Sequence, residues 1–561
     1  MKKFSWLLTA ICIAGVLFSS CSKKNETANM IPADAMFVAH ANIESMGDKL
    51  SWSQIKETAW FKKGYGDTSR SAWEKKLLDN PETSGIQFDK GLTFFATKRG
   101  ESFYLVVEGF LKNATEFSDF NKNFGTGKEV TKNGDLQFLQ VQDAAIVGWS
   151  DKRFAYVMNT GTTPAELPDF SPVQYQQTQA TSPVDLTAYC TSLFNLKSDS
   201  SLAKNEHFTD LLGAKGDIHI WQNTHAIMNT MPVSALSMLK LDVFFKDNYS
   251  ATTINFEKGK IEADSKQYTS KELMDFINKN KGSKINMDMA RNIPSNDIAM
   301  LFAANFKPGA LQEFIKLTGA DGFVNMYLQQ AGFSLDDLSK ANNGDMLLAL
   351  ADIRMKQDSV DMQDSEGNVM NRRSTTRPDM NVLFSMSVQD KASFQKIVDA
   401  GKKLAGGIDT DTTVAMVLTD KYFAAGNSKT FVNNYLSGGK QDISFLDDIK
   451  GSPIGAFIDL QKMMNMGGSD MITDSSTTAM LNASKKMWKN AIVTGGDTKG
   501  GALTFHGEVN LVDGEKSSLQ QLNQYLDQLF VLNEQRMKQM PEARNLDSLL
   551  TPPPMDTVNV P

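Results

Sequence analysis

The sequence predicts an α+β fold composed of two similar halves, each with antiparallel sheets packed against helices. Two observations lead to this prediction. Short apolar runs joined by tight turns occur among helices of ordinary length, without the regular strand–helix alternation that is typical of a doubly wound parallel sheet. In addition, four blocks of sequence recur in the same order along the 561-residue chain, which indicates an internal duplication.

The first two repeated blocks predict strands. Residues 31–42 begin with Ile-Pro, continue into an apolar run and resemble residues 293–305. Residues 103–120 resemble residues 380–397, and in both segments a continuous apolar run gives way to apolar residues at three- and four-residue spacing. This change of period predicts a strand that leads directly into a helix.

The third block predicts a β-hairpin, because two apolar runs flank a polar Asp-Lys pair, at residues 151–152 in one copy and 420–421 in the other. The fourth block aligns residues 215–229 with residues 450–465. Each half then ends in a helix with one apolar face, at residues 270–277 and 519–529. Four matches in the same order are therefore interpreted as a repeat.

These matches divide the chain into segments. They are a signal segment at residues 1–20, a tether at 21–30, a first half at 31–290, a second half at 291–535 and a Pro-containing tail at 536–561 that is predicted to be disordered. The second half contains a polar insertion at residues 356–377, which predicts a solvated hairpin loop.

The first 21 residues have the parts of an export signal. Lys2 and Lys3 precede an apolar run at residues 6–18, which is shorter than the roughly 20 apolar residues that span a membrane. The following Ser-Ser-Cys sequence, ending at Cys21, resembles the lipobox of bacterial lipoproteins, in particular the variants of Bacteroidetes-type proteins. The resemblance implies cleavage before Cys21 and acylation of that residue. The alternative is an ordinary secretory signal followed by a chance cysteine.

The Ile-Pro strand, the two-half organisation and the lipobox together resemble an uncharacterised family of Bacteroidetes-type lipoproteins that is known as a domain of unknown function. This resemblance spans nearly the whole chain after the signal. It implies a protein of the cell envelope, held to the outer membrane by lipid on Cys21. Lys23 and Lys24 stand where surface-exported lipoproteins of that group carry an acidic run, so the resemblance implies that the protein faces the periplasm. The family's signatures are structural and imply neither a catalytic residue nor a cofactor.

Charge and cysteine content narrow the function classes further. The chain has 58 basic and 65 acidic residues, so its net charge is −7, which becomes −9 when Lys2 and Lys3 are removed with the signal. A mildly acidic protein is a poor ligand for nucleic acid, and no nucleic-acid partner is expected. Of the three cysteines, Cys12 lies in the signal and Cys21 is the predicted acylation site. Cys190 is therefore predicted to be a buried core residue without a disulfide partner.

The histidines offer a weak candidate for a metal site. His219 and His225 are the only closely spaced pair among the five histidines, and a zinc site needs at least a third ligand. In the repeat alignment they fall opposite Gly455 and Gln461, neither of which would bind zinc in the same way. We therefore predict no metal and no cofactor, and keep His219 and His225 as weak candidates.

Three other motifs have simpler explanations. The acidic pair at residues 409–411 and the acidic insertion lack the spacing of a calcium loop. Residues 125–128 lack the first glycine and the final Ser or Thr of a phosphate-binding loop. The Ser-x-x-Lys spacing at residues 53–56 is better explained as the start of a helix capped by Ser51 or Ser53.

Aromatic residues gather in the region after the first strand, and they are Trp52, Trp60, Trp73, Phe61 and Tyr65. Such residues either bind hydrophobic or sugar partners or pack helices onto sheets, and the second interpretation is favoured because apolar residues at helical spacing are usually core. The function expected is non-enzymatic binding between the two halves, either of a protein of the envelope machinery or of an apolar or glycan ligand. The alternatives are an envelope hydrolase acting on glycan or peptide, and a structural spacer.

Overall fold

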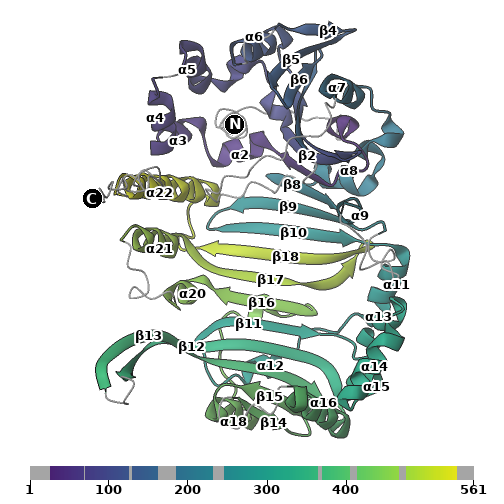
Figure 1. Cartoon of the computed structure of the whole chain (residues 1–561), viewed down its shortest axis with the longest axis vertical. Coiled ribbons are helices and arrows are strands. Elements are labelled where there is room, and N and C mark those ends of the chain that lie inside the picture. Colours follow the sequence, from purple (N-terminus) through teal and green to yellow (C-terminus); the bar gives the residue numbers. More distant parts are fainter. Residues whose placement is uncertain are drawn as a thin grey trace, which may run out of the picture.

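The computed structural model describes residues 26–68, 70–124, 129–161, 185–230, 246–363, 369–404, 414–466 and 475–539. Within these residues, eighteen strands form one antiparallel sheet with helices packed against it (Figure 1). The predicted α+β class with antiparallel pairing is confirmed. None of the described helices is both long enough and apolar enough to cross a membrane.

Ten of these eighteen described strands belong to the first part of the chain. They are β1 (Phe37–Ala41), β2 (Leu92–Arg99), β3 (Ser102–Phe110), β4 (Thr131–Asn133), β5 (Leu136–Gln142), β6 (Ala145–Trp149), β7 (Arg153–Gly161), β8 (Ile218–Asn223), β9 (Tyr249–Glu257) and β10 (Lys260–Tyr268). Their order across the sheet is β4-β5-β6-β7-β3-β2-β1-β8-β9-β10.

The other eight described strands belong to the second part. They are β11 (Ile298–Asn305), β12 (Asn342–Gln363), β13 (Val369–Val388), β14 (Ala415–Leu418), β15 (Tyr422–Gly426), β16 (Ile454–Asp459), β17 (Trp488–Lys499) and β18 (Ala502–Leu511). Their order is β14-β15-β13-β12-β11-β16-β17-β18. Both predicted hairpins are present, with residues 151–152 and 420–421 at their turns.

The two parts have the same pattern of strand pairing. β1 lies between β2 and β8, and β11 lies in the same way between β12 and β16. His40 pairs with His219. In the repeat alignment His40 falls opposite Ala303 and His219 opposite Gly455, and these two residues also pair with each other. The last strands of the two parts, β10 and β18, pair and join the whole into one sheet. A common origin of the two halves stays a prediction.

Helices connect these strands. In the first part they are α2 (Ile43–Lys49), α3 (Trp52–Lys56), α4 (Ala59–Gly66), α5 (Ala72–Asp79), α6 (Ala114–Phe124), α7 (Leu186–Phe194), α8 (Glu206–Gly213), α9 (Thr224–Met228), α11 (Lys271–Asn280) and α12 (Met287–Arg291). In the second part they are α13 (Ala310–Leu317), α14 (Asp321–Ala331), α15 (Leu335–Ala341), α16 (Lys391–Leu404), α18 (Lys429–Ser437), α19 (Leu446–Ile449), α20 (Leu460–Met466), α21 (Ser475–Met487) and α22 (Ser518–Gln539). Short 3₁₀ segments lie at Thr27–Met30, Pro81–Ser84, Phe88–Lys90, Ser198–Ser200 and Leu202–Lys204.

Two separate hydrophobic cores lie on the same face of the sheet. The first includes Phe95, Val38 and Trp221, which follow one another across β2, β1 and β8, and α7 and α8 pack on this side. The second includes Leu301 and Phe457 on β11 and β16, under α18 and α19. The strands between the two cores, β9, β10, β18 and β17, present polar side chains on this face.

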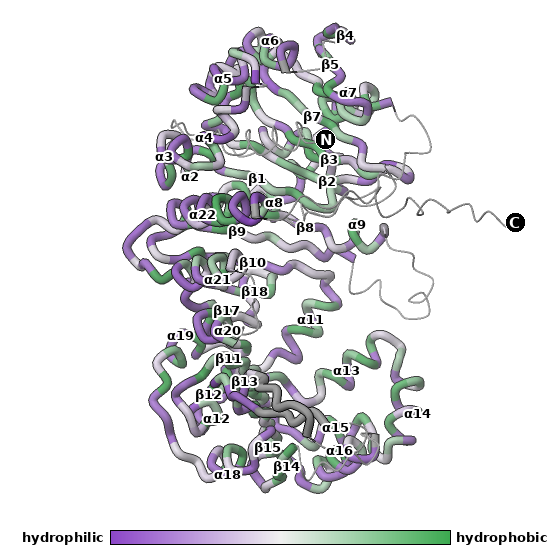
Figure 2. The backbone as a smooth tube through the Cα atoms, turned by 60° about the vertical axis from the view of Figure 1, so that its left-hand side comes forward, coloured by the Kyte–Doolittle hydropathy of each residue, from purple (hydrophilic) through white to green (hydrophobic). Residues whose placement is uncertain are grey.

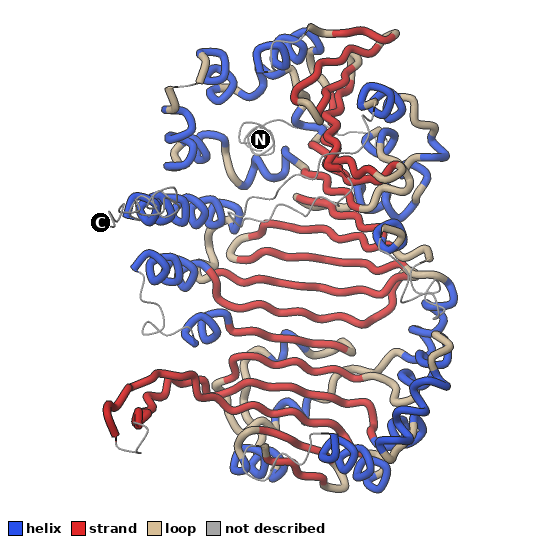
Figure 3. Tube along the Cα trace, in the orientation of Figure 1, coloured by secondary structure: helices blue, strands red, loops and turns tan. Residues whose placement is uncertain are grey.

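The insertion at residues 356–377 differs from the prediction of a loop. β12 and β13 continue through it as a paired ribbon, whose last pair is Gln363 with Val369, and Figure 3 shows this arm curving away from the body. Backbone hydrogen bonds can hold a two-stranded ribbon even where its side chains are polar. Asp352, with a positive φ of 54°, lies at the bulge where the arm begins and accepts hydrogen bonds from Ser295 (2.7 Å) and Asn381 (2.9 Å).

The predicted start of the disordered tail, at residue 536, is also corrected. α22 runs on to Gln539, so the first four residues of the predicted tail are helical. Its polar C-terminal turns lack the apolar stripe on which the prediction relied, but Arg536 and Lys538 in the last turn complement the negative end of the helix dipole.

Candidate functional site

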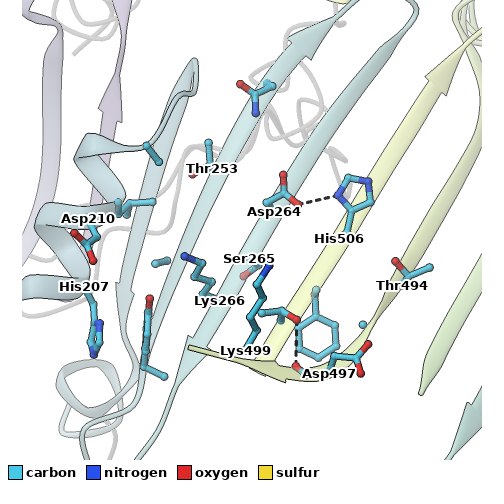
Figure 4. A pocket seen from close by; sticks show the side chains of 18 of the residues that line it. His207, Asp210, Thr253, Asp264, Ser265, Lys266, Thr494, Asp497, Lys499 and His506 are labelled. Atoms are coloured by element: carbon cyan, nitrogen blue, oxygen red, sulfur yellow. Dashed lines mark hydrogen bonds and ion pairs between the residues drawn. The ribbon is translucent and has the colours of Figure 1, made fainter. Parts of the chain in front are cut away.

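A pocket of about 470 Å³ lies where the two parts of the chain meet, across the pairing of β10 with β18. Its floor is formed by β9, β10, β18 and β17, and its sides by α8 and by the loop before β16 (Figure 4). The pocket opens on the sheet face that carries the two hydrophobic cores, in the space between them. Helices cover this face over each core, but the strands of the pocket floor carry polar residues there. Pockets between two structural units are common ligand sites.

His506 occupies the middle of the pocket floor. Its Nδ1 lies 2.8 Å from an oxygen of Asp264, the residue that faces it on β10, and its Nε2 lies 3.1 Å from Glu508. Partial burial alone would lower the pKa of His506, but the hydrogen bonds to Asp264 and Glu508 outweigh burial and raise it. A histidine between two carboxylates is best satisfied as an imidazolium that donates from both nitrogens. His506 therefore has no free nitrogen with which to act as a base.

Lys266 and Lys499 extend into the pocket from β10 and β17, the two strands that flank β18 (Figure 4). Lys266 faces Thr504 across the strand pair, and Asp497 faces the same threonine from the other side. Neither lysine forms an ion pair with any residue in the described part of the chain. The pocket thus contains two ammonium groups that are available to an anionic ligand.

The α8 side of the pocket carries an aromatic pair. The ring of His207, an exposed residue in the first turn of α8, stacks on the buried Tyr268 with 3.8 Å between ring centroids and 14° between ring planes. Burial raises the pKa of Tyr268, to which nearby Asp210 also contributes. The stacked pair gives the pocket a flat aromatic side next to its charged floor.

The two histidines that were candidates for a metal site do not lie together. His219 is buried on β8, where it stacks on His40 with 6.1 Å between centroids and donates from Nε2 to the carbonyl of Ala214 at 3.1 Å. Burial lowers the pKa of both rings, to about 3 for His40, so both are neutral. His225 is exposed on α9. The described residues contain no cluster of three potential metal ligands.

The predicted acylation site, Cys21, lies outside the described residues, as do residues 125–128 and 409–411. The aromatic group after the first strand is mostly core, since Trp52 packs edge-on against the buried Phe61 and donates to the carbonyl of Leu78. Ser51 caps α3 through a capping box with Gln54, which agrees with the simpler explanation of the Ser-x-x-Lys spacing.

Cys190 is buried in the first core, as its isolation in the sequence predicts, and burial raises the pKa of its thiol to about 12. Thiolate is the reactive form, so this cysteine is expected to be inert in the folded protein. A Cys21→Ala variant from which the signal segment with Cys12 has been cleaved retains Cys190 as its single thiol. Ellman's reagent at pH 8 is expected to label no thiol of this variant in native buffer and one thiol per chain in guanidinium. Rapid labelling in native buffer would show that the side chain is accessible.

A second surface feature lies on α13 and α14, which stand clear of the sheet in Figure 2. Its apolar residues expose between 40% and 63% of their surface, and they are Leu311, Phe314, Phe323, Met326 and Tyr327. Neither helix contains a buried residue. Large exposed apolar side chains on two neighbouring helices are typical of a surface that contacts another molecule.

Sequence reasoning missed the pocket residues Asp264, Lys266, Lys499 and His506. The sequence did contain one indication of the pocket, since residues 262–267 are polar at nearly every position. A strand that is polar on both faces is expected to lie uncovered by helices. Predicting the pocket also requires knowing that β10 and β18 are neighbours, and a single sequence does not show this.

Comparison with protein-family models identifies a family for this chain. The model DUF4836, described as a domain of unknown function, matches residues 27–365, which is more than half of the chain. The chain belongs to the DUF4836 family. The match begins just before β1 and ends in the arm formed by β12 and β13, so it includes the α8 and β10 sides of the pocket.

Other comparisons add little to this assignment for the DUF4836 chain. No curated protein matches it. A solved structure titled "Structure of crystal form I of TP0453" is similar over 48% of this chain and 90% of its own, with 10% sequence identity and a TM-score of 0.23. A likeness at that TM-score bears on neither the fold nor the function of the chain.

Proposed function

We propose that this DUF4836 chain is a lipid-anchored protein of the cell envelope that binds a ligand, without catalysis, in the pocket at the β10–β18 seam. The observation that carries the proposal is the pocket itself, which lies where the two parts meet and is lined by polar groups from both. The shared strand pairing supports a further proposal, that the two parts arose by duplication and that the pocket came into being when their last strands joined.

The start of the described chain supports an anchor close to the membrane. Arg153 donates to the carbonyl oxygens of Glu26 (2.8 Å) and Thr27 (3.4 Å), and Lys90 pairs with the Glu26 carboxylate at 3.4 Å. Glu26 lies five positions after Cys21, a stretch that spans at most about 18 Å at full extension. Lipid on Cys21 would therefore hold the first part of the chain against the membrane surface.

Binding is favoured over hydrolysis by the state of His506. A hydrolase of the Ser-His type needs an imidazole nitrogen that faces the nucleophile, whereas both nitrogens of His506 face carboxylates. Asp264, the acid nearest the middle of the pocket floor, is engaged by the same imidazolium. The middle of the floor thus holds a paired His506 and Asp264, and the lysines beside them can bind an anion.

Anchoring is tested by fractionating cells that express the protein or its Cys21→Ala variant. Wild-type protein is expected in the outer-membrane fraction and protected from protease in intact cells, because the lipid would hold it on the periplasmic side of that membrane. The variant is expected in the soluble periplasmic fraction, folded and of normal abundance. Membrane retention of the variant, or cleavage of the wild type in intact cells, would contradict the anchor or its orientation.

Binding is tested with Thr504→Trp, which fills the middle of the pocket, and with Lys340→Gln on α15 as a control outside it. Immobilised wild type and control are expected to capture the same component from solubilised envelopes, and the pocket variant is expected to lose it. Equal capture by all three proteins, or hydrolysis of envelope material by the wild type, would overturn the proposal.

A further inference from the structure

We infer that the pocket binds an acidic glycan, with a sugar carboxylate held by Lys266 and Lys499 and a sugar ring lying against His207. The inference rests on the proposed function and names the chemical class of its ligand. Three features of the pocket carry it, which are its local charge, its aromatic side and the hydrogen-bonding groups of its floor.

Lysines that are unpaired in the described part of the chain line the pocket, although the chain as a whole is acidic. Lys215, Lys266 and Lys499 stand with the three carboxylates Asp210, Asp264 and Asp497, while His506 lies between Asp264 and Glu508. Asp264 is engaged by His506, while Lys266 and Lys499 have no carboxylate partner within the described residues. Two ammonium groups in one pocket repel each other, and a bound carboxylate relieves this repulsion while accepting hydrogen bonds from both.

The position of the two lysines suits a single anionic group. They come from the strands on either side of β18, and Thr504 of β18 lies between these strands, with its hydroxyl donating to the backbone carbonyl of Asp497 at 3.1 Å. Asp497 faces the same threonine, so a bulky polyanion would meet a like charge at this end of the pocket. A carboxylate carries one negative charge and is repelled less than a polyphosphate would be.

The aromatic side suits a sugar ring. His207 is exposed and stacks flat on Tyr268, so the tyrosine covers one face of the imidazole, and the other face has no aromatic neighbour among the described residues. Flat aromatic groups stack on the C–H faces of sugars, and the floor supplies Thr253, Asn255 and Thr494 as hydrogen-bonding partners for hydroxyl groups. A fatty acid would find few apolar contacts on such a floor.

The inference is tested by isothermal titration calorimetry with the lipidated protein in detergent and hexagalacturonate as the probe. Hexagalacturonate is expected to bind, and maltohexaose, which lacks carboxylates, is expected not to. Lys266→Gln and Lys499→Gln should each weaken binding about tenfold, the effect of losing one charged hydrogen bond. His207→Ala should also weaken it, whereas Lys340→Gln should not.

Several results would overturn the inference. Tripolyphosphate that binds as tightly as hexagalacturonate, with no loss in His207→Ala, would identify an anion site without sugar recognition. If a hexaglutamate peptide binds more tightly than hexagalacturonate, the ligand is an acidic peptide. Binding of maltohexaose, or binding of hexagalacturonate that survives both lysine substitutions, would exclude the carboxylate contact, and absence of any hexagalacturonate binding would exclude the acidic glycan.

Failure of this inference and failure of the proposed function give different results. If only the inference fails, envelope capture still depends on the pocket, because Thr504→Trp abolishes it while Lys266→Gln and Lys499→Gln leave it unchanged. If the proposed function fails, Thr504→Trp captures as much envelope material as the wild type.

Discussion

The Arg153→Met variant is expected to unfold with a free energy about 3–5 kcal/mol lower than that of the wild type, the usual effect of leaving one charge of a buried pair without its partner. Glu108 is completely buried on β3, and Arg153 of the neighbouring β7 is its ion-pair partner. The second oxygen of Glu108 has no hydrogen-bond partner within the described residues. Denaturant unfolding at pH 8 measures the loss.

The double variant Arg153→Met, Glu108→Gln is the control for this pair. It removes both charges, so it is expected to recover a large part of the stability lost in the single variant. It also tests whether Arg153 matters mainly as a counterion or mainly through its hydrogen bonds to Glu26 and Thr27. No recovery in the double variant would mean that the contacts with the N-terminal segment dominate.

The same pair predicts a pH dependence. Burial raises the pKa of Glu108 from 4.5 to about 7, although Arg153 opposes the shift. Because the folded pKa is the higher one, the stability contributed by the protonated carboxyl is complete below about pH 4.5 and is lost as the pH rises through 7. The loss in the free energy of unfolding caused by Arg153→Met should therefore be smaller at pH 5 than at pH 8. A penalty that does not change with pH would show that Glu108 does not ionise in this range.

The second large effect is expected from Asp217→Ala. Asp217 is completely buried at the start of β8 and accepts three hydrogen bonds of 2.6 Å, from Ser45, from the ammonium of Lys49 and from the backbone N–H of Phe256. Its removal leaves these donors without their acceptor, and a loss of about 3–5 kcal/mol in the free energy of unfolding is expected.

Two further variants define the Asp217 result. Asp217→Asn keeps the size of the side chain and one acceptor oxygen, so its loss should be smaller than that of the alanine variant. Asp199→Ala removes an exposed ion pair with Lys204 (2.9 Å) and should leave the unfolding midpoint unchanged. If Asp217→Ala is no less stable than Asp199→Ala, the contacts of Asp217 do not hold α2, β8 and β9 together.

Local features of the fold could be predicted from the sequence. The turns at residues 151–152 and 420–421 are determined by polar pairs between apolar strands, and the Ser51 cap is determined by neighbouring groups. In each case the residues that decide the structure lie within a few positions of one another.

The features that could not be predicted depend on contacts between distant segments. The pairing of Asp264 with His506 joins residues 242 positions apart, and neither strand carries a pattern that identifies its neighbour. The pocket exists only because of this pairing, so its residues could not be grouped in advance. The arm of β12 and β13 was missed for a related reason, since its polar residues lack the alternation that distinguishes a strand from a loop.

The central claim, that the pocket at the β10–β18 seam is the ligand site, is tested most directly by hydrogen–deuterium exchange of the lipidated protein with and without the envelope component that it captures. We predict that bound ligand slows exchange in α8, β9, β10, β17 and β18. Unchanged exchange in these elements, with slower exchange in α13 and α14 or in the arm of β12 and β13, would contradict the claim and would place binding on one of those surfaces instead.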